Sequence, residues 1–276
     1  MIPEDLRKPS QSDILANMGV LRWLILIYVF GFFPSNAQAC RQALVLALDV
    51  SGSVDPSEYR LQIEGLANAL DAPEIRQLIL STPDRPVALA VFEWSSRNHQ
   101  YLIQPWIELT SDTALDLAIM RIRSHRKIRA GLRTAMGTAL QYGGQLLAQR
   151  PNCWRHTIDV SGDGRSNIGP QPKRVTETGR FKDVTVNGLV VSKNPRNTSD
   201  PAKTIRKQEE LRFYFQSNVI HGPGAFVELA EGYTDFERAM RQKLAREMAL
   251  PLLGSLRQPA LATLSPRYET SATSPE

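Results

Sequence analysis

The feature that most constrains this chain is an apolar run that ends in a carboxylate followed by two hydroxyls. Residues 43–48 are continuously apolar, as is typical of a strand buried on both faces of a parallel sheet. Asp49, Ser51 and Ser53 follow at i, i+2 and i+4, and Gly52 allows a tight turn between the serines. Three oxygen donors on one loop suit Mg²⁺ or Mn²⁺ better than Zn²⁺. The same residue types also cap helices, so this loop alone leaves both interpretations open.

Two later segments supply oxygen donors that can reach the same edge of a sheet. Residues 157–161 have the pattern of a second short strand, and Asp163 follows directly before Gly164. Thr134 begins a pattern typical of the first turn of an amphipathic helix. In open α/β sheets, ligands bind outside the carboxyl ends of the strands, where the strand order reverses. The sequence therefore predicts one divalent-cation site formed by five residues: Asp49, Ser51, Ser53, Thr134 and Asp163.

In these segments the chain resembles the von Willebrand factor type A domains and their metal-ion-dependent adhesion site. In that family an Asp-x-Ser-x-Ser loop, a Thr from a second loop and an Asp from a third surround one cation, and the five residues above match this pattern. Segments 91–95, 158–164 and 218–226 further resemble a bacterial branch of exported A domains of unknown function. The resemblance covers roughly residues 42–249. It implies binding of a partner protein that offers an acidic residue to the cation.

The second loop departs from the family pattern. It usually reads Gly-Gly-Thr, whereas here Leu132 and Arg133 precede Thr134, which puts a bulky cation beside the expected ligand. Thr138, one helical turn later, is the alternative ligand. Arg133 also leaves open a structural A domain with a degenerate site.

Residues 1–39 have the layout of a secretory signal peptide. Residues 23–33 are an uninterrupted run of eleven apolar residues, fewer than the roughly 20 needed to span a bilayer. Ala37 and Ala39 fit the small residues that precede a cleavage site, and Met18 gives a more ordinary start for such a signal. We therefore expect a periplasmic or secreted protein with no stable membrane span.

The two cysteines predict a disulfide in an exported chain. Cys40 lies nine residues before Asp49, and Cys153 lies ten before Asp163. If the two strands are adjacent and parallel, both cysteines lie at the edge opposite the predicted cation site, close enough to be bridged. Lipid attachment at an N-terminal Cys40 is the alternative. Ala37 disfavours it, because a larger aliphatic residue is expected there in a bacterial lipoprotein.

Much of the positive charge, which is +5 net, gathers just before and within the second loop. Arg126, Lys127, Arg129 and Arg133 are the candidates for contacting an acidic protein partner near the cation, and a solvated surface is the alternative. No interleaved aromatic residues or recognised nucleic-acid-binding fold accompany this cluster, so nucleic-acid binding is not expected.

Catalysis is not expected either. The sequence has no Gly-x-Ser-x-Gly elbow and no glycine-rich phosphate loop with Lys. A metal-dependent phosphohydrolase is the alternative function, but it would need a general base close to the cation. Asp49 and Asp163 are already assigned to the cation, and no other base is indicated.

Alternating strand and helix patterns predict an α/β fold: a doubly wound, mostly parallel, Rossmann-like sheet with helices on both faces and an antiparallel edge hairpin. The domain is expected to span residues 40–250. Residues 251–276 are expected to be a disordered tail, since the composition shifts to Pro, Ser and Thr. The expected strands are 43–48, 87–94, 100–109, 155–160, 184–191 and 225–229, and the expected helices are 56–70, 111–124, 134–149, 171–181, 202–216 and 233–248.

Overall fold

The computed structural model describes residues 40–128, 131–192 and 198–249. The expected signal peptide with its Met18 start, the basic residue Arg129 and the expected C-terminal tail lie outside the described residues.

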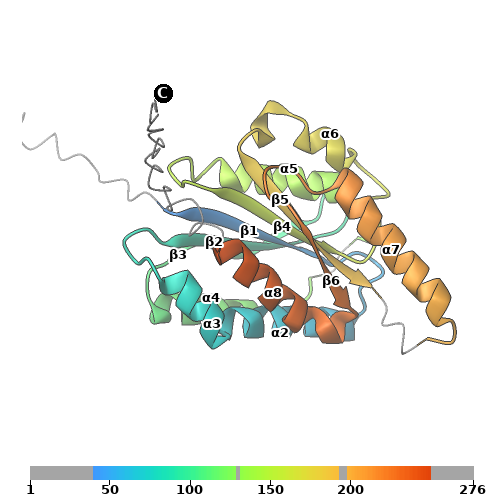
Figure 1. Ribbon diagram of the computed structural model, residues 1–276, viewed down its shortest axis with the longest axis horizontal. Helices are drawn as coiled ribbons and strands as arrows, with labels where there is room; N and C mark the ends of the chain where they lie inside the picture. The colour runs from blue at the N-terminus through green and yellow to red at the C-terminus, as the bar shows by residue number, and fades with distance from the viewer. Residues whose placement is uncertain (1–39, 129–130, 193–197, 250–276) are drawn as a thin grey trace, which may run out of the picture. The chain divides into compact units, whose positions relative to one another are not determined.

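A six-stranded sheet forms the centre of the described chain (Figure 1). The strand order is β3-β2-β1-β4-β5-β6, and of these six strands β3 alone runs antiparallel to its neighbour. This arrangement confirms the predicted doubly wound, mostly parallel sheet with an antiparallel edge hairpin. The strands are β1 (Gln42–Asp49), β2 (Val87–Trp94), β3 (Gln100–Leu109), β4 (His156–Gly162), β5 (Val184–Ser192) and β6 (Val227–Glu231).

Helices cover both faces of the sheet, so every residue of β1 is buried (Figure 1). The side chains of β1 alternate between two apolar clusters: Leu44 and Leu46 pack in one, and Val45 and Ala47 pack in the other. The first cluster is covered by α2 (Pro56–Asp71), α3 (Pro73–Leu80), α4 (Asp112–Ser124) and α8 (Phe236–Ala249), and the second by α5 (Met136–Leu147), α6 (Pro172–Thr176) and α7 (Pro201–Asn218).

The structure differs from the predicted elements in several places. Helix α3 was not predicted; it begins at Pro73, and proline is favoured at the first position of a helix. Helix α5 begins at Met136 instead of Thr134, since the backbone N–H of Ala135 donates to the carbonyl of Ser95 (2.7 Å) and holds that segment outside the helix. The expected helix 171–181 is α6 followed by a separate 3₁₀ turn, Gly179–Phe181.

The strand order reverses between β1 and β4. After β1 the chain builds β2 and β3 on one side, then crosses over to build β4, β5 and β6 on the other. Because β1 and β4 are parallel neighbours, their carboxyl ends form one edge, from which Asp49 and Asp163 emerge on adjacent loops.

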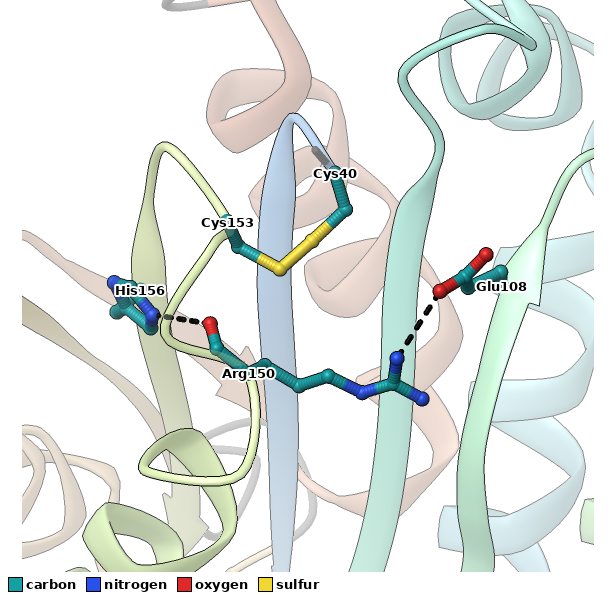
Figure 2. The surroundings of a disulfide bond; sticks show 5 residues. All are labelled: Cys40, Glu108, Arg150, Cys153 and His156. Carbon is teal, nitrogen blue, oxygen red and sulfur yellow. Dashed lines mark hydrogen bonds and ion pairs between the residues drawn. A yellow bond between two sulfur atoms is a disulfide. The ribbon is translucent and has the colours of Figure 1, made fainter. Parts of the chain in front are cut away.

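The predicted disulfide is confirmed at the opposite edge of the sheet. Figure 2 shows Cys40, which precedes β1, bonded to Cys153 in the turn before β4, with their Cα atoms 4.5 Å apart. The same turn is held by Arg150: its carbonyl accepts from Nε2 of His156 (2.8 Å), and its guanidinium pairs with Glu108 (3.0 Å) (Figure 2). One sulfur cannot carry both a disulfide and a thioether lipid, so this bond is incompatible with lipid attachment at Cys40.

Candidate functional site

The loop that follows β1 is a tight turn built around the carboxylate of Asp49. This side chain is fully buried, and its Oδ1 accepts a hydrogen bond from the backbone N–H of Ser51 (2.8 Å). The hydroxyl oxygens of Ser51 and Ser53 lie 3.3 Å apart. Helix α2 is capped by Asp55, whose Oδ1 accepts from the first-turn N–H groups of Ser57 and Glu58. Because Asp55 does the capping, the three earlier oxygen donors are not needed for it.

Direct contacts join this loop to the two other loops of the predicted site. The hydroxyl of Ser53 donates to Oδ1 of Asp163 (2.8 Å), which links the carboxyl ends of β1 and β4. The N–H of Gly52 donates to the carbonyl of Leu132 (3.4 Å) in the second loop. A Cβ at position 52 would lie only 3.0 Å from that carbonyl oxygen, so glycine is required for the two loops to pack this closely.

The second and third loops are also joined, through the main chain of Thr134. Its N–H donates to Oδ1 of Asn167 (3.0 Å), and its carbonyl accepts from the N–H of Asn167 (2.9 Å) and the hydroxyl of Ser166 (3.3 Å). The Thr134 side chain is buried, with 7% of the residue exposed. Thr138, the alternative ligand, lies within α5 with its hydroxyl against Gly169, where a Cβ would approach it to 2.9 Å.

The charges at this edge favour a bound cation. Burial, together with the negative charge of Asp163, raises the pKa of the Asp49 carboxyl to about 7, although the hydrogen bonds from Ser51 act in the opposite direction. Burial likewise raises the pKa of Asp163. Oδ2 of Asp49 is buried without a hydrogen-bond partner among the described residues. Two desolvated carboxylates and an unpartnered oxygen fit a divalent cation, which would neutralise both charges and occupy that oxygen.

The predicted basic residues are distributed unevenly around this edge. The ammonium of Lys127 donates to the carbonyl of Val54 (2.6 Å), and its positive charge slightly offsets the rise in the pKa of Asp49. Arg133 is exposed. Arg126 is also exposed; it lies with Glu64 in a depression between α2 and α4, and it lines a second depression with Lys127 and Pro56. Lys127 is therefore hydrogen-bonded to the backbone directly after Ser53.

Tyr233 was not recognised from the sequence, where it was placed at the start of the closing helix. It instead lies in a 3₁₀ turn, Tyr233–Asp235, just beyond β6, after Gly232 with a φ of 95°. Tyr233 is 7% exposed, and its hydroxyl has no hydrogen-bond partner among the described residues. Burial and the negative charges of Asp163 and Asp49 raise its pKa. No local sequence pattern marks it, because its position depends on β6 ending at the same edge of the sheet as β1 and β4.

A second buried carboxylate, Glu93 at the end of β2, is engaged elsewhere. It accepts from the hydroxyl of Tyr59 (3.0 Å) and lies beside Nε2 of His99 (3.1 Å) and of His125 (3.3 Å).

Within the described residues, no group of three or more His, Cys, Asp or Glu side chains is arranged to hold a metal. The predicted cation site is not a group of this kind, because three of its five donor residues contribute hydroxyl groups. None of the described helices is long and apolar enough to cross a bilayer.

Solved structures share this architecture at low sequence identity. Proximal thread matrix protein 1 from the mussel byssus matches with a TM-score of 0.51 and 15% identity over 77% of this chain and 49% of its own. A structure of that protein with a zinc-occupied MIDAS motif gives a TM-score of 0.50 and 13% identity, covering 76% of this chain and 46% of its own. The pilus adhesin SpaC from Lactobacillus rhamnosus GG gives a TM-score of 0.50 and 11% identity, covering 76% and 30%.

A von Willebrand factor type A protein from Catenulispora acidiphila also matches, with a TM-score of 0.46 and 14% identity over 76% of this chain and 43% of its own. The chain spans about half the length of the mussel protein and about a third of the adhesin. No curated protein matches the sequence. Residues 39–251 match a family model. The fold is that of von Willebrand factor type A domains, and the chain belongs to the family described as "Protein of unknown function (DUF1194)".

Proposed function

We propose that this chain is an exported protein-binding module of the adhesion type, which holds a divalent cation and presents it to an acidic residue of a partner protein. The observation that carries this proposal is Oδ2 of Asp49, which is buried and has no hydrogen-bond partner among the described residues. An unsatisfied buried oxygen costs about 1–3 kcal/mol, and more when the group is charged. A cation bound between the three loops would remove that cost.

Five residues would hold the cation: Asp49, Ser51, Ser53, Thr134 and Asp163. Their donors are all oxygens, which favours Mg²⁺ or Mn²⁺, while the zinc-occupied MIDAS motif of the mussel protein makes Zn²⁺ a necessary comparison. When bound, the cation supplies a localised positive charge to which a carboxylate of another protein can bind. The protein's own part is to bury Asp49 and to fix the hydroxyls beside it.

Binding has better support than catalysis. A phosphohydrolase would need a free general base, and two further carboxylates, Glu58 and Asp200, line the same groove as Ser53 and Asp163. Glu58 accepts from the N–H of Asp55 (2.9 Å) and Asp200 accepts from the N–H of Lys203 (2.9 Å), so both are engaged at helix N-termini. A degenerate structural domain also has less support, because Arg133 is exposed instead of lying against the buried carboxylates.

Export is part of the proposal. The Cys40–Cys153 disulfide fits an oxidising compartment, either the periplasm or the outside of the cell. Two of the proteins with this fold are a matrix protein from the mussel byssus and a pilus adhesin. The apolar segment within residues 1–39 would direct the chain there.

Calorimetric titration tests the cation site. Mg²⁺, Mn²⁺ and Zn²⁺ are titrated into the chelator-stripped protein, into Asp163→Ala and into Asp116→Ala, whose carboxylate is exposed on α4. We expect saturable one-site binding that weakens at least about 100-fold in Asp163→Ala and is unchanged in Asp116→Ala. Equal affinity in all three proteins would overturn the assignment.

A further inference from the structure

A groove of about 720 Å³ adjoins the predicted cation site and is not explained by it. Its lining includes Ser53 and Asp163 of the predicted site, Val191 near the end of β5, and Tyr233 in the turn that follows β6. Two turns of α7 form a wall, with Lys203, Thr204, Lys207, Gln208 and Leu211 facing it. The groove therefore continues from the site along α7 at the carboxyl edge of the sheet, the edge where ligands bind in such folds.

The acidic and basic side chains of the groove differ in whether they already have hydrogen-bond partners. Glu58 and Asp200 are held at helix N-termini by backbone N–H groups, which stabilise their charge. The ammonium groups of Lys203 and Lys207 make no hydrogen bond or ion pair with any described residue, and both side chains are exposed. The basic groups are therefore available to a ligand, whereas the acidic groups are already engaged.

The charge of the groove depends on the cation. Its lining has as many basic as acidic side chains, with Arg165 on the basic side and Asp163 on the acidic side. A bound divalent cation next to Ser53 would make the net charge of the lining positive, so the groove would then attract an acidic ligand.

The spacing of the two lysines fits an extended peptide. They stand four residues apart on α7, which places them about 6 Å apart along the helix axis. Side chains on one side of an extended chain recur about every 6–7 Å. Acidic residues at alternate positions of an extended segment would therefore meet Lys203 and Lys207 in turn.

We propose that this groove receives an extended segment of a partner protein with acidic residues at alternate positions, one on the cation and the next ones on Lys203 and Lys207. The inference rests on the proposed function, because the first acidic residue binds the cation. The lysines determine specificity: they select a segment with several acidic residues over one with a single acidic residue.

The test uses two blocked glycine–serine peptides of equal length, one with a single glutamate and one with glutamates at three alternate positions. Each is titrated into the whole protein in saturating Mg²⁺. The variant is Lys203→Glu/Lys207→Glu, and the matched control is Lys173→Glu/Arg174→Glu, which makes the same charge change on exposed residues of α6. Circular dichroism and a separate metal titration check that both variants are folded and bind Mg²⁺.

We expect the peptide with alternating glutamates to bind at least about tenfold tighter than the single-glutamate peptide, with the difference shrinking at high salt. That advantage should be lost in Lys203→Glu/Lys207→Glu and kept in the α6 control. Two results would overturn this inference alone: normal Mg²⁺ binding with equal affinity for the two peptides, or a preference for the alternating peptide that persists in the charge reversal on α7, Lys203→Glu/Lys207→Glu. No Mg²⁺ binding by the wild type would overturn the proposed function as well. Metal-dependent self-association that the α7 reversal abolishes would identify a second copy as the occupant and also contradict the proposal.

Discussion

The hydroxyl of Ser53 donates a 2.8 Å hydrogen bond to the carboxylate of Asp163, although the two residues are 110 positions apart in the chain. The contact exists because β1 and β4 are parallel neighbours, so the loops at their carboxyl ends lie side by side. It joins two of the proposed ligands directly. The proposed cation site is thus a consequence of strand order.

Metal-free protein should lose stability as the pH rises. The pKa of Asp49 is raised from 3.8 to about 7, so the folded state holds a proton that the unfolded state releases. The stabilisation is therefore complete below about pH 4 and is lost between about pH 4 and pH 7, to the extent of a few kcal/mol. Urea denaturation of chelator-treated protein at pH 4, 5, 6 and 7 measures this slope.

Asp49→Asn is the variant that isolates this effect, because an amide does not titrate. Asp163 and Glu247 also have raised pKa values and contribute to the slope in both proteins, so the difference between wild type and variant reports mainly on Asp49. Added Mg²⁺ should restore stability at pH 7 in the wild type alone. If the free energy of unfolding of the two proteins changed with pH in the same way, the raised pKa of Asp49 would be refuted.

Gly52→Ala should weaken cation binding without unfolding the protein. The added Cβ would meet the carbonyl oxygen of Leu132 at 3.0 Å and its Cα at 3.1 Å, so the first two loops must separate by a few tenths of an ångström. We expect about a tenfold loss of Mg²⁺ affinity by calorimetry. Gly164→Ala is the matched control, since a Cβ there would meet nothing within 4 Å. The same loss in both variants would show that the packing of the loops is not responsible.

Removing the disulfide should destabilise the fold and leave the cation site intact. The bond joins residues 113 positions apart and lies at the amino ends of β1 and β4, opposite the site. Cys40→Ala/Cys153→Ala should lower the free energy of unfolding by about 2–5 kcal/mol, as measured in urea. Mg²⁺ affinity at 25 °C should stay within about threefold of the wild type. Finding two free thiols in protein purified from the periplasm would contradict the bond itself.

The buried ion cluster of α8 should tolerate little change. The ammonium of Lys243 is fully buried and pairs with Asp159 of β4 and with Glu247 (2.8 Å), while burial raises the pKa of Glu247. Lys243→Met would leave two buried carboxyl groups without their cation and should cost about 3–5 kcal/mol in thermal or urea unfolding. Lys207→Met, on an exposed site, is the control and should change stability by less than about 0.5 kcal/mol. An equal loss of stability in Lys243→Met and Lys207→Met would contradict a stabilising role for this ion cluster.

The sequence predicted those parts of the fold that depend on continuous local patterns. The apolar run before Asp49 identified β1, and the similar spacing of each cysteine from its aspartate, nine and ten residues, identified the disulfide, because parallel neighbours share one register. Helix α3 was missed, since Pro73 can either end a helix or begin one. Which of the two applies depends on packing against the sheet.

The parts of the site that could not be predicted come from tertiary contacts. Tyr233 approaches the aspartates only because β6 ends at the same edge as β1 and β4, which no local pattern reveals. The groove along α7 likewise depends on how that helix crosses the sheet. The hydrogen bonds of Thr134 to Asn167 show the same limit, since the two residues lie on loops far apart in the chain.

The most direct test of the central claim is an anomalous-difference map from crystals of the protein soaked in Mn²⁺. We predict one strong peak bounded by Asp49 Oδ2 and the hydroxyls of Ser51 and Ser53, with Thr134 and Asp163 completing its surroundings. The peak should be absent from crystals of Asp49→Asn treated in the same way. A map with no peak at this edge, in crystals that leave it open to solvent, would contradict the account.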